Sequence, residues 1–111
     1  MSLEPIRRET WPLQEERFLD LLDGARGSQE LLEAVKYQVQ NGGKRLRALL
    51  PVLVQNDLAQ AWDYEDHHGQ ECALWSGLAV ELLHAATLCH DDVMDGDRLR
   101  RDQPTVCGGW P

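Results

Sequence analysis

Three aspartates, Asp91, Asp92 and Asp95, follow directly on a long apolar segment. On a helix, Asp91 and Asp95 share one face and Asp92 lies beside them, three positions before Asp95. The spacing therefore predicts three carboxylates that converge at one helix end. Hard oxygen ligands suit Mg²⁺, which takes one or two carboxylates together with water and the oxygens of a bound phosphate. We predict a magnesium site at Asp91, Asp92 and Asp95 that a diphosphate would complete, with Asp91 and Asp95 as its catalytic residues.

The alternative for this cluster is an acidic helix end that only faces solvent. A ligand site is favoured because His84 precedes Asp91 by two helical turns and shares its face. His84 itself fits a hydrogen-bonded core histidine and a ligand contact equally well. His90, next to the cluster, is more typical of packing than of metal ligation.

Cations that could hold an anion occur in two further places. The segment GGKRLR places three cations within one turn of a predicted helix start, after two glycines that free the backbone. Lys44 and Arg47 share a face, so we predict that they contact a diphosphate, whereas Arg45 has a structural or solvent role. Arg100 and Arg101 carry forked guanidinium groups that suit phosphate oxygens. Taken alone, GGKRLR also fits a plain polar helix start.

Composition limits the class of protein. The 111 residues include 42% hydrophobic residues, as in one small globular domain. The net charge of −8 argues against nucleic acid as a partner, since such surfaces neutralise phosphates. Three cysteines without a C-x-x-C pair and an N-terminus without a secretory signal predict a cytoplasmic protein. The apolar stretch from Cys72 to Cys89 contains Glu81 and His84, which favours a buried helix over a transmembrane segment.

Apolar spacing predicts an all-α fold, an antiparallel helical bundle. Helices are expected over residues 13–22, 29–40, 44–61 and 71–92, with residues 1–12 irregular, 63–70 a loop, and no strand pattern from residue 96 onward. Ser28 is a natural N-cap, and Pro51 predicts a kink or a nearby helix start. Two of the helices are apolar almost all round, so a homodimer, a complementary chain or further C-terminal residues should cover them.

These motifs together resemble the trans-isoprenyl diphosphate synthases, also called polyprenyl synthetases. GGKRLR at 42–47 is similar to the family's GGKRLRP box, and residues 81–106 are similar to the segment with its first aspartate-rich motif. The resemblance runs from about Leu31 to Val106. It implies that residues 1–111 form the N-terminal helices of the isoprenoid synthase fold, in an incomplete polyprenyl synthetase domain without the second aspartate-rich motif.

The resemblance also implies an activity: Mg²⁺-dependent, head-to-tail condensation of isopentenyl diphosphate with an allylic diphosphate. Isopentenyl diphosphate would be held by four residues, Lys44, Arg47, His84 and Arg101. Arg100 would contact the allylic diphosphate, Asp91 and Asp95 would bind Mg²⁺, and Asp92 would assist nearby. Ala86 stands where a bulky residue would block the growing product, which favours a long-chain polyprenyl diphosphate.

Two departures from the family pattern are Ala48, in place of the last proline of the box, and Asp102, in place of a glycine after the arginine pair. The alternative to an enzyme is a non-catalytic or regulatory partner subunit, or a truncated fragment of such a synthase. A terpene cyclase would share the aspartate cluster but has no need for a second diphosphate pocket, so GGKRLR argues against it.

Overall fold

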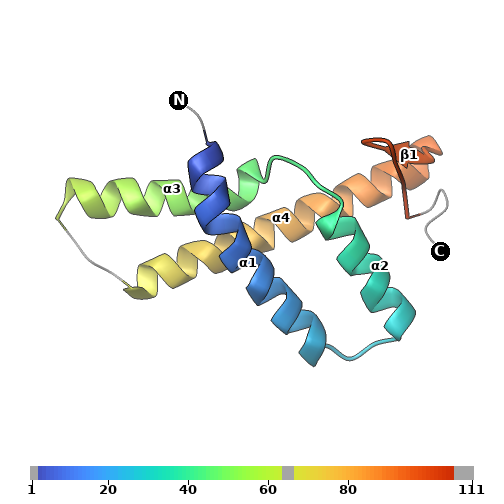
Figure 1. Cartoon of the computed structure of the whole chain (residues 1–111), viewed down its shortest axis with the longest axis horizontal. Helices are drawn as coiled ribbons and strands as arrows, with labels where there is room; N and C mark the ends of the chain where they lie inside the picture. The colour runs from blue at the N-terminus through green and yellow to red at the C-terminus, as the bar shows by residue number, and fades with distance from the viewer. Residues whose placement is uncertain (1–2, 64–66, 107–111) are drawn as a thin grey trace. The chain divides into compact units, whose positions relative to one another are not determined.

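The computed structural model describes residues 3–63 and 67–106, and these residues confirm the all-α prediction (Figure 1). The helices are α1 (Glu4–Gly24), α2 (Gln29–Gln40), α3 (Leu46–Ala61) and α4 (His67–Asp95). Two short strands, β1 (Leu99–Arg100) and β2 (Gln103–Pro104), form an antiparallel hairpin after α4. The expectation of no strand after residue 96 was therefore wrong. Cys107 lies outside the described residues.

Helix α1 starts earlier than predicted, because neither of its prolines ends it. Pro5 occupies the second helical position, where a backbone N–H has no partner within the helix. Pro12 lies inside the helix. In the first turn, Glu4 accepts a hydrogen bond from Arg7 at 2.6 Å, which supports the helix start. The prediction of an irregular opening segment was wrong.

Helix α2 matches its prediction. The backbone N–H of Leu31 donates to the Ser28 hydroxyl at 3.1 Å, as expected of an N-cap serine, and Asn41 is the C-cap. Helix α3 begins at Leu46, five residues before Pro51, and continues through the proline to Ala61. Helix α4 begins at His67, so the predicted loop was too long at its C-terminal end.

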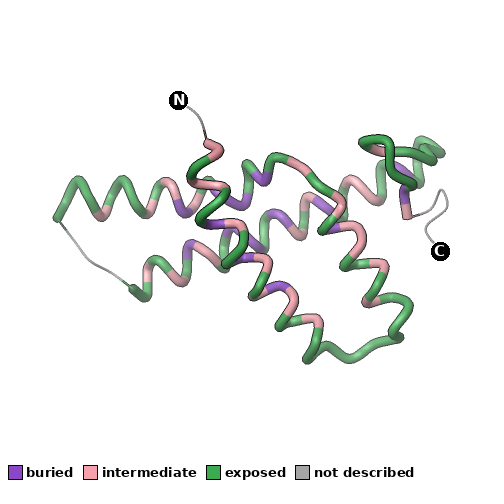
Figure 2. Tube along the Cα trace, in the orientation of Figure 1, coloured by how far each residue is buried: buried purple, intermediate pink, exposed green. Residues whose placement is uncertain are grey.

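By its contacts the chain divides into two units. The first comprises residues up to Phe18 together with Lys44–Glu81. Its buried apolar residues are Phe18, Ala48, Leu49, Val52, Ala73 and Leu78 on α1, α3 and α4 (Figure 2). Helices α3 and α4 approach closely at Gly77, where an added Cβ would lie 2.0 Å from the Ala48 carbonyl oxygen. Only glycine fits there without a shift of the helices.

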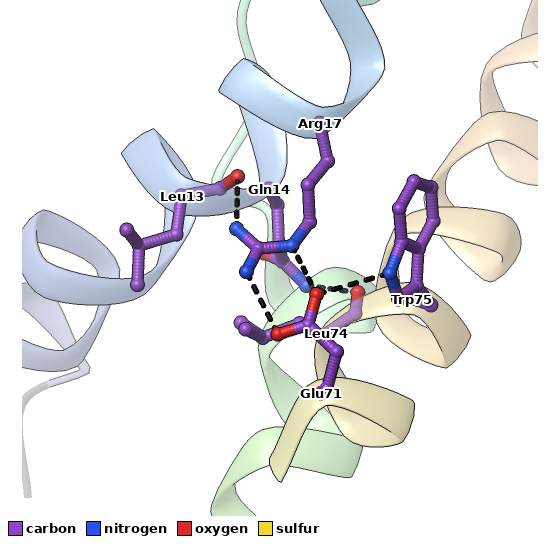
Figure 3. Close-up of polar contacts among 6 residues, drawn as sticks. All are labelled: Leu13, Gln14, Arg17, Glu71, Leu74 and Trp75. Carbon is purple, nitrogen blue, oxygen red and sulfur yellow. Dashed lines mark hydrogen bonds and ion pairs between the residues drawn. The ribbon is translucent and has the colours of Figure 1, made fainter. Parts of the chain in front are cut away.

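Helix α1 is tied to both of these helices by polar side chains, and Figure 3 shows the contacts with α4. The fully buried Gln14 donates its amide N–H groups to the carbonyl oxygens of Ala48 at 2.9 Å and Leu74 at 3.1 Å. Arg17 donates twice to Glu71, at 2.6 and 2.8 Å, and Trp75 donates to the same carboxylate at 3.1 Å. These bonds fix where α1 crosses α3 and α4 in the first unit.

The second unit comprises Leu19–Gly43 and the residues from Leu82 onward. Val39 of α2 and Ala85 of α4 are its buried apolar residues among those described. The hydroxyl of Tyr37 on α2 donates to the carbonyl oxygen of Pro104, which joins the hairpin to α2.

Many large apolar side chains remain exposed. On α3 they form one stripe at intervals of four residues, Leu46, Leu50, Val54 and Leu58. Helix α4 is long and apolar enough to cross a membrane by length and composition alone, and 28% of its most apolar window is buried. The core helices of soluble proteins meet the same criterion. The predicted excess of apolar surface is confirmed. The prediction that this apolar helix is buried is not met, because the described residues leave much of α4 exposed.

Candidate functional site

The aspartate cluster lies at the C-terminal end of α4, which stops there for a local reason. Gly96 has φ of +68° and follows the last helical residue, Asp95. The N–H of Gly96 donates to the Val93 carbonyl at 3.3 Å, and the N–H of Asp97 donates to the Asp92 carbonyl at 2.9 Å. This pair of bonds with a left-handed glycine is a Schellman motif. The helix therefore ends directly after the third aspartate.

The three aspartates have different surroundings. Asp91 and Asp95 are exposed, whereas Asp92 is 1% exposed. Its carboxylate accepts hydrogen bonds from Arg100, with the shortest distance 2.6 Å from Nη2 to Oδ1. Hydrogen bonding to Asp92 and the charge of that carboxylate, with smaller contributions from the charges of Asp97 and Asp91, raise the pKa of Arg100 above its ordinary value.

The pairing of Asp92 with Arg100 corrects the prediction that all three carboxylates converge. In residues 3–63 and 67–106, no group of three or more His, Cys, Asp or Glu side chains lies close enough to hold a metal ion. The oxygens of Asp92 accept hydrogen bonds from Arg100 instead. Asp91 and Asp95 remain as exposed hard oxygen donors on one helix face, which fits a Mg²⁺ ion that draws its other ligands from water and phosphate.

The hairpin that follows places the two arginines. Arg101 and Asp102 occupy its two-residue turn, with φ of +50° and +62°, as a type I′ turn requires. Thr105 is buried and closes the loop: its hydroxyl donates to the Asp97 carbonyl at 2.8 Å, and its N–H donates to the Arg98 carbonyl at 2.9 Å. Arg100 is thereby directed to Asp92, while Arg101 is exposed.

Arg101 lies against the glycine pair of the GGKRLR segment. A Cβ added to Gly42 would meet the Arg101 Cδ at 3.7 Å, and one added to Gly43 would meet Nη2 at 3.5 Å. Both glycines have positive φ, +102° and +119°, which side chains rarely adopt. The second unit therefore brings together Arg101 and the start of GGKRLR, a contact that sequence spacing alone does not reveal.

The remaining predicted residues are placed as follows. Lys44 precedes α3 and Arg47 lies in its first turn, and both are exposed. They belong to the first unit, whereas His84 and the aspartates belong to the second. His84 is half-buried on α4, and its carbonyl accepts a hydrogen bond from the Thr87 hydroxyl at 2.7 Å. His90 is exposed.

One residue of the GGKRLR segment differs from the others. Arg45 is 7% exposed, donates from Nη1 to Glu81 Oε1 at 3.3 Å, and lies over the ring of Trp11. The structural role was one of the two roles predicted for Arg45, and it is confirmed. Sequence reasoning missed Glu81 and Trp11 as its partners, because nothing in their spacing links them to position 45.

Comparison with known proteins identifies relatives of this chain. The sequence profile of the polyprenyl synthetase family matches residues 28–110. A geranylgeranyl diphosphate synthase from Sulfolobus acidocaldarius is 44% identical over 78 residues, which are 69% of this chain and 21% of that protein. A probable farnesyl diphosphate synthase from Bradyrhizobium diazoefficiens is 45% identical over 82 residues, covering 72% and 22% of the two chains.

A third relative is heptaprenyl diphosphate synthase component 2 from Geobacillus stearothermophilus, 37% identical over 78 residues, which are 70% of this chain and 22% of that protein. No solved structure matches. The chain thus spans about a fifth of the length of the curated relatives it matches. Every aspartate, arginine, lysine and histidine discussed as a site residue lies within the matched segment. The chain belongs to the polyprenyl synthetase family.

Proposed function

We propose that this chain contributes to a prenyltransferase that condenses isopentenyl diphosphate with an allylic diphosphate to form a polyprenyl diphosphate. The observation that carries the proposal is that both motifs, GGKRLR and the aspartate cluster, fall within the segment that matches the family. The relatives named above are prenyl diphosphate synthases, which supports the same reaction class here.

In this reaction the bond between the allylic carbon and its diphosphate oxygen breaks, and the electron pair leaves with the diphosphate. The double bond of isopentenyl diphosphate attacks that carbon, a new carbon–carbon bond forms, and a proton is lost. Lys44, Arg47, His84 and Arg101 would bind the diphosphate of isopentenyl diphosphate and so orient its double bond. Positive groups near the leaving diphosphate favour the reaction by stabilising its developing charge.

Arg100 would serve the allylic diphosphate. Its hydrogen bonds to Asp92 use Nε and Nη2, and none of those bonds uses Nη1. A guanidinium held by a buried carboxylate has a fixed orientation, which favours phosphate binding through the remaining N–H groups. Asp92 would therefore act through Arg100 and close to the metal.

Asp91 and Asp95 would hold Mg²⁺, which supplies positive charge to the allylic diphosphate when bound. Two exposed carboxylates four residues apart suit this ion.

We further propose that the product is long, because Ala86 and Thr87 are small residues one turn before the cluster. The relatives' names include farnesyl, geranylgeranyl and heptaprenyl products, so their names do not choose a length. We also propose a cytoplasmic location without a transmembrane segment. Residues 1–111 are assigned, as part of the same proposal, to the N-terminal helices of the polyprenyl synthetase domain.

A second candidate function is a non-catalytic or regulatory subunit that pairs with another chain, or with a second copy of itself. Two observations favour it. One relative is named as a component of its synthase, and the described helices leave a stripe of apolar residues exposed on α3. Such a subunit need not bind diphosphates, whereas the prenyltransferase must. Binding of isopentenyl diphosphate therefore distinguishes the two candidate functions.

Calorimetric titration of isopentenyl diphosphate into the 111-residue chain, with Mg²⁺ present, tests the proposal. Lys44→Gln and Arg47→Gln should each weaken binding by about ten- to a hundredfold, because each removes one charge-assisted hydrogen bond to the diphosphate. Lys36→Gln, which removes an exposed cation of α2, is the matched control and should bind as the parent does. Absence of binding by the parent chain, or an equal loss in the control, would favour the subunit.

A further inference from the structure

Arg45 has a backbone conformation that its residue type does not favour. It is the N-cap of α3 with φ of +59°, in the left-handed region, and no side-chain hydrogen bond caps the helix. Non-glycine residues adopt this region only when their surroundings impose it. Gly42 and Gly43, which also have positive φ, stand before Lys44 in the same segment, yet position 45 carries an arginine.

The side chain of Arg45 supplies the compensating contacts. Its guanidinium carbon lies 4.1 Å from the centroid of the Trp11 ring, and Nη1 lies 3.3 Å from Glu81 Oε1. The side chains of Arg45 and Glu81 are only 7% and 8% exposed. Removal of Arg45 would therefore take this ion pair from the buried Glu81 carboxylate, which is costly in the interior. Three elements, α1, α3 and α4, meet at this one guanidinium in the first unit.

This arrangement separates the cations of GGKRLR by function. Because the chain turns at Arg45, that side chain is buried, while Lys44 before it and Arg47 after it remain exposed. We propose that Arg45 is a positioning residue: through Trp11 and Glu81 it fixes the backbone from Lys44 to Arg47, so that these two cations are held ready for a diphosphate. The proposal rests on the proposed function only for the identity of the anion.

Nuclear magnetic resonance of the full chain tests the fixed backbone without any ligand. In Arg45→Met, the amide signals of residues 44–47 should shift and broaden, and residue 45 should lose the coupling constant of a positive φ. Arg17→Met is the matched control, because it breaks another ion pair between α1 and α4, with Glu71, away from this segment. In the control, the signals of residues 44–47 should stay in place.

Titration of isopentenyl diphosphate then tests the consequence for binding. Arg45→Met should weaken binding by about ten- to a hundredfold, since displacements of about 1 Å in a binding group have effects of that size. Arg45→Lys, which keeps the charge, should recover part of the affinity. The Arg17→Met control should lower the melting temperature without changing the affinity.

The outcomes separate the two proposals. If the parent chain binds no diphosphate but the signals of residues 44–47 shift only in Arg45→Met, the proposed function fails and the positioning role stands. If Arg45→Met leaves those signals and the affinity unchanged, or Arg17→Met alters them equally, the positioning role is overturned. Should Arg45→Met not fold, Trp11→Leu, which retains the ion pair, is expected to shift the same amides by a smaller amount, and an unchanged spectrum would overturn the proposal.

Discussion

Asp92 holds the end of α4 through two different groups. Its carbonyl accepts from the N–H of Asp97 in the helix-terminating motif, and its carboxylate accepts from Arg100 of the hairpin. One residue thus couples the end of the helix to the strand that follows. The spacing of the aspartates predicts which of them share a helix face. It does not predict that Asp92 turns to Arg100, since that contact depends on the loop conformation set by Gly96 and on the turn at Arg101.

Asp102 is one of the two departures from the family pattern that the sequence resembles, and the structure gives this departure a physical meaning. It occupies the second turn position with φ of +62°, where glycine has no steric penalty. Asp102→Gly should therefore raise the free energy of unfolding by about 0.5–1 kcal/mol. Urea denaturation followed by circular dichroism measures this change.

Asp102→Ala is the control for this substitution, because alanine lacks both the freedom of glycine and the local hydrogen bonding of aspartate. It should lower the unfolding free energy. If the glycine variant were no more stable than the parent, the turn at Arg101 and Asp102 would not limit the hairpin.

At the scale of elements, α1 shows where pattern reasoning succeeds and fails. The helical spacing of its apolar residues after Pro12 predicts a helix, yet the structure extends it back to Glu4. The polar residues decide its docking: Gln14 is fully buried, and its amide bonds to carbonyl oxygens of α3 and α4. A buried glutamine carries no signal in a hydrophobic pattern, so neither the longer helix nor its crossing point could be predicted from spacing.

The ion pair of Arg17 with Glu71 links α1 to α4 and gives stability a predictable dependence on pH. Hydrogen bonds from Arg17 lower the pKa of Glu71 below its ordinary value of 4.5. A lowered carboxyl pKa stabilises the folded state above the ordinary value, and this contribution is lost as the pH falls below 4.5 through the folded-state pKa. Glu71→Gln should therefore lower the melting temperature at pH 7.

The difference in melting temperature between the parent and Glu71→Gln should shrink as the pH is lowered from 5 toward 3, measured by calorimetry in low salt. Glu33→Gln, a change on an exposed residue of α2, should leave a pH profile like that of the parent. A difference that stays constant across this pH range would show that Glu71 acts through packing and not through its charge.

At the scale of the whole molecule, the exposed apolar surface and the length of the relatives both bear on whether the chain works together with a second polypeptide. The matched segment accounts for 21–23% of the first relatives' length, and large apolar side chains are exposed on α1, α2, α3 and α4. Apolar surface of this extent is stabilised when another element covers it. A second polypeptide that covers this surface should therefore stabilise the chain.

We therefore expect the chain to show condensation activity when a second polypeptide supplies the part of a polyprenyl synthetase that follows the matched segment. The mixture should incorporate labelled isopentenyl diphosphate in the presence of Mg²⁺ and lose the activity on chelation, because the leaving diphosphate needs a compensating cation. Asp91→Ala should lower the rate at least a hundredfold, whereas Asp57→Ala, on exposed α3 surface, should not. Assembly without turnover would support the subunit function, and turnover that survives Asp91→Ala would refute the role of the aspartate cluster.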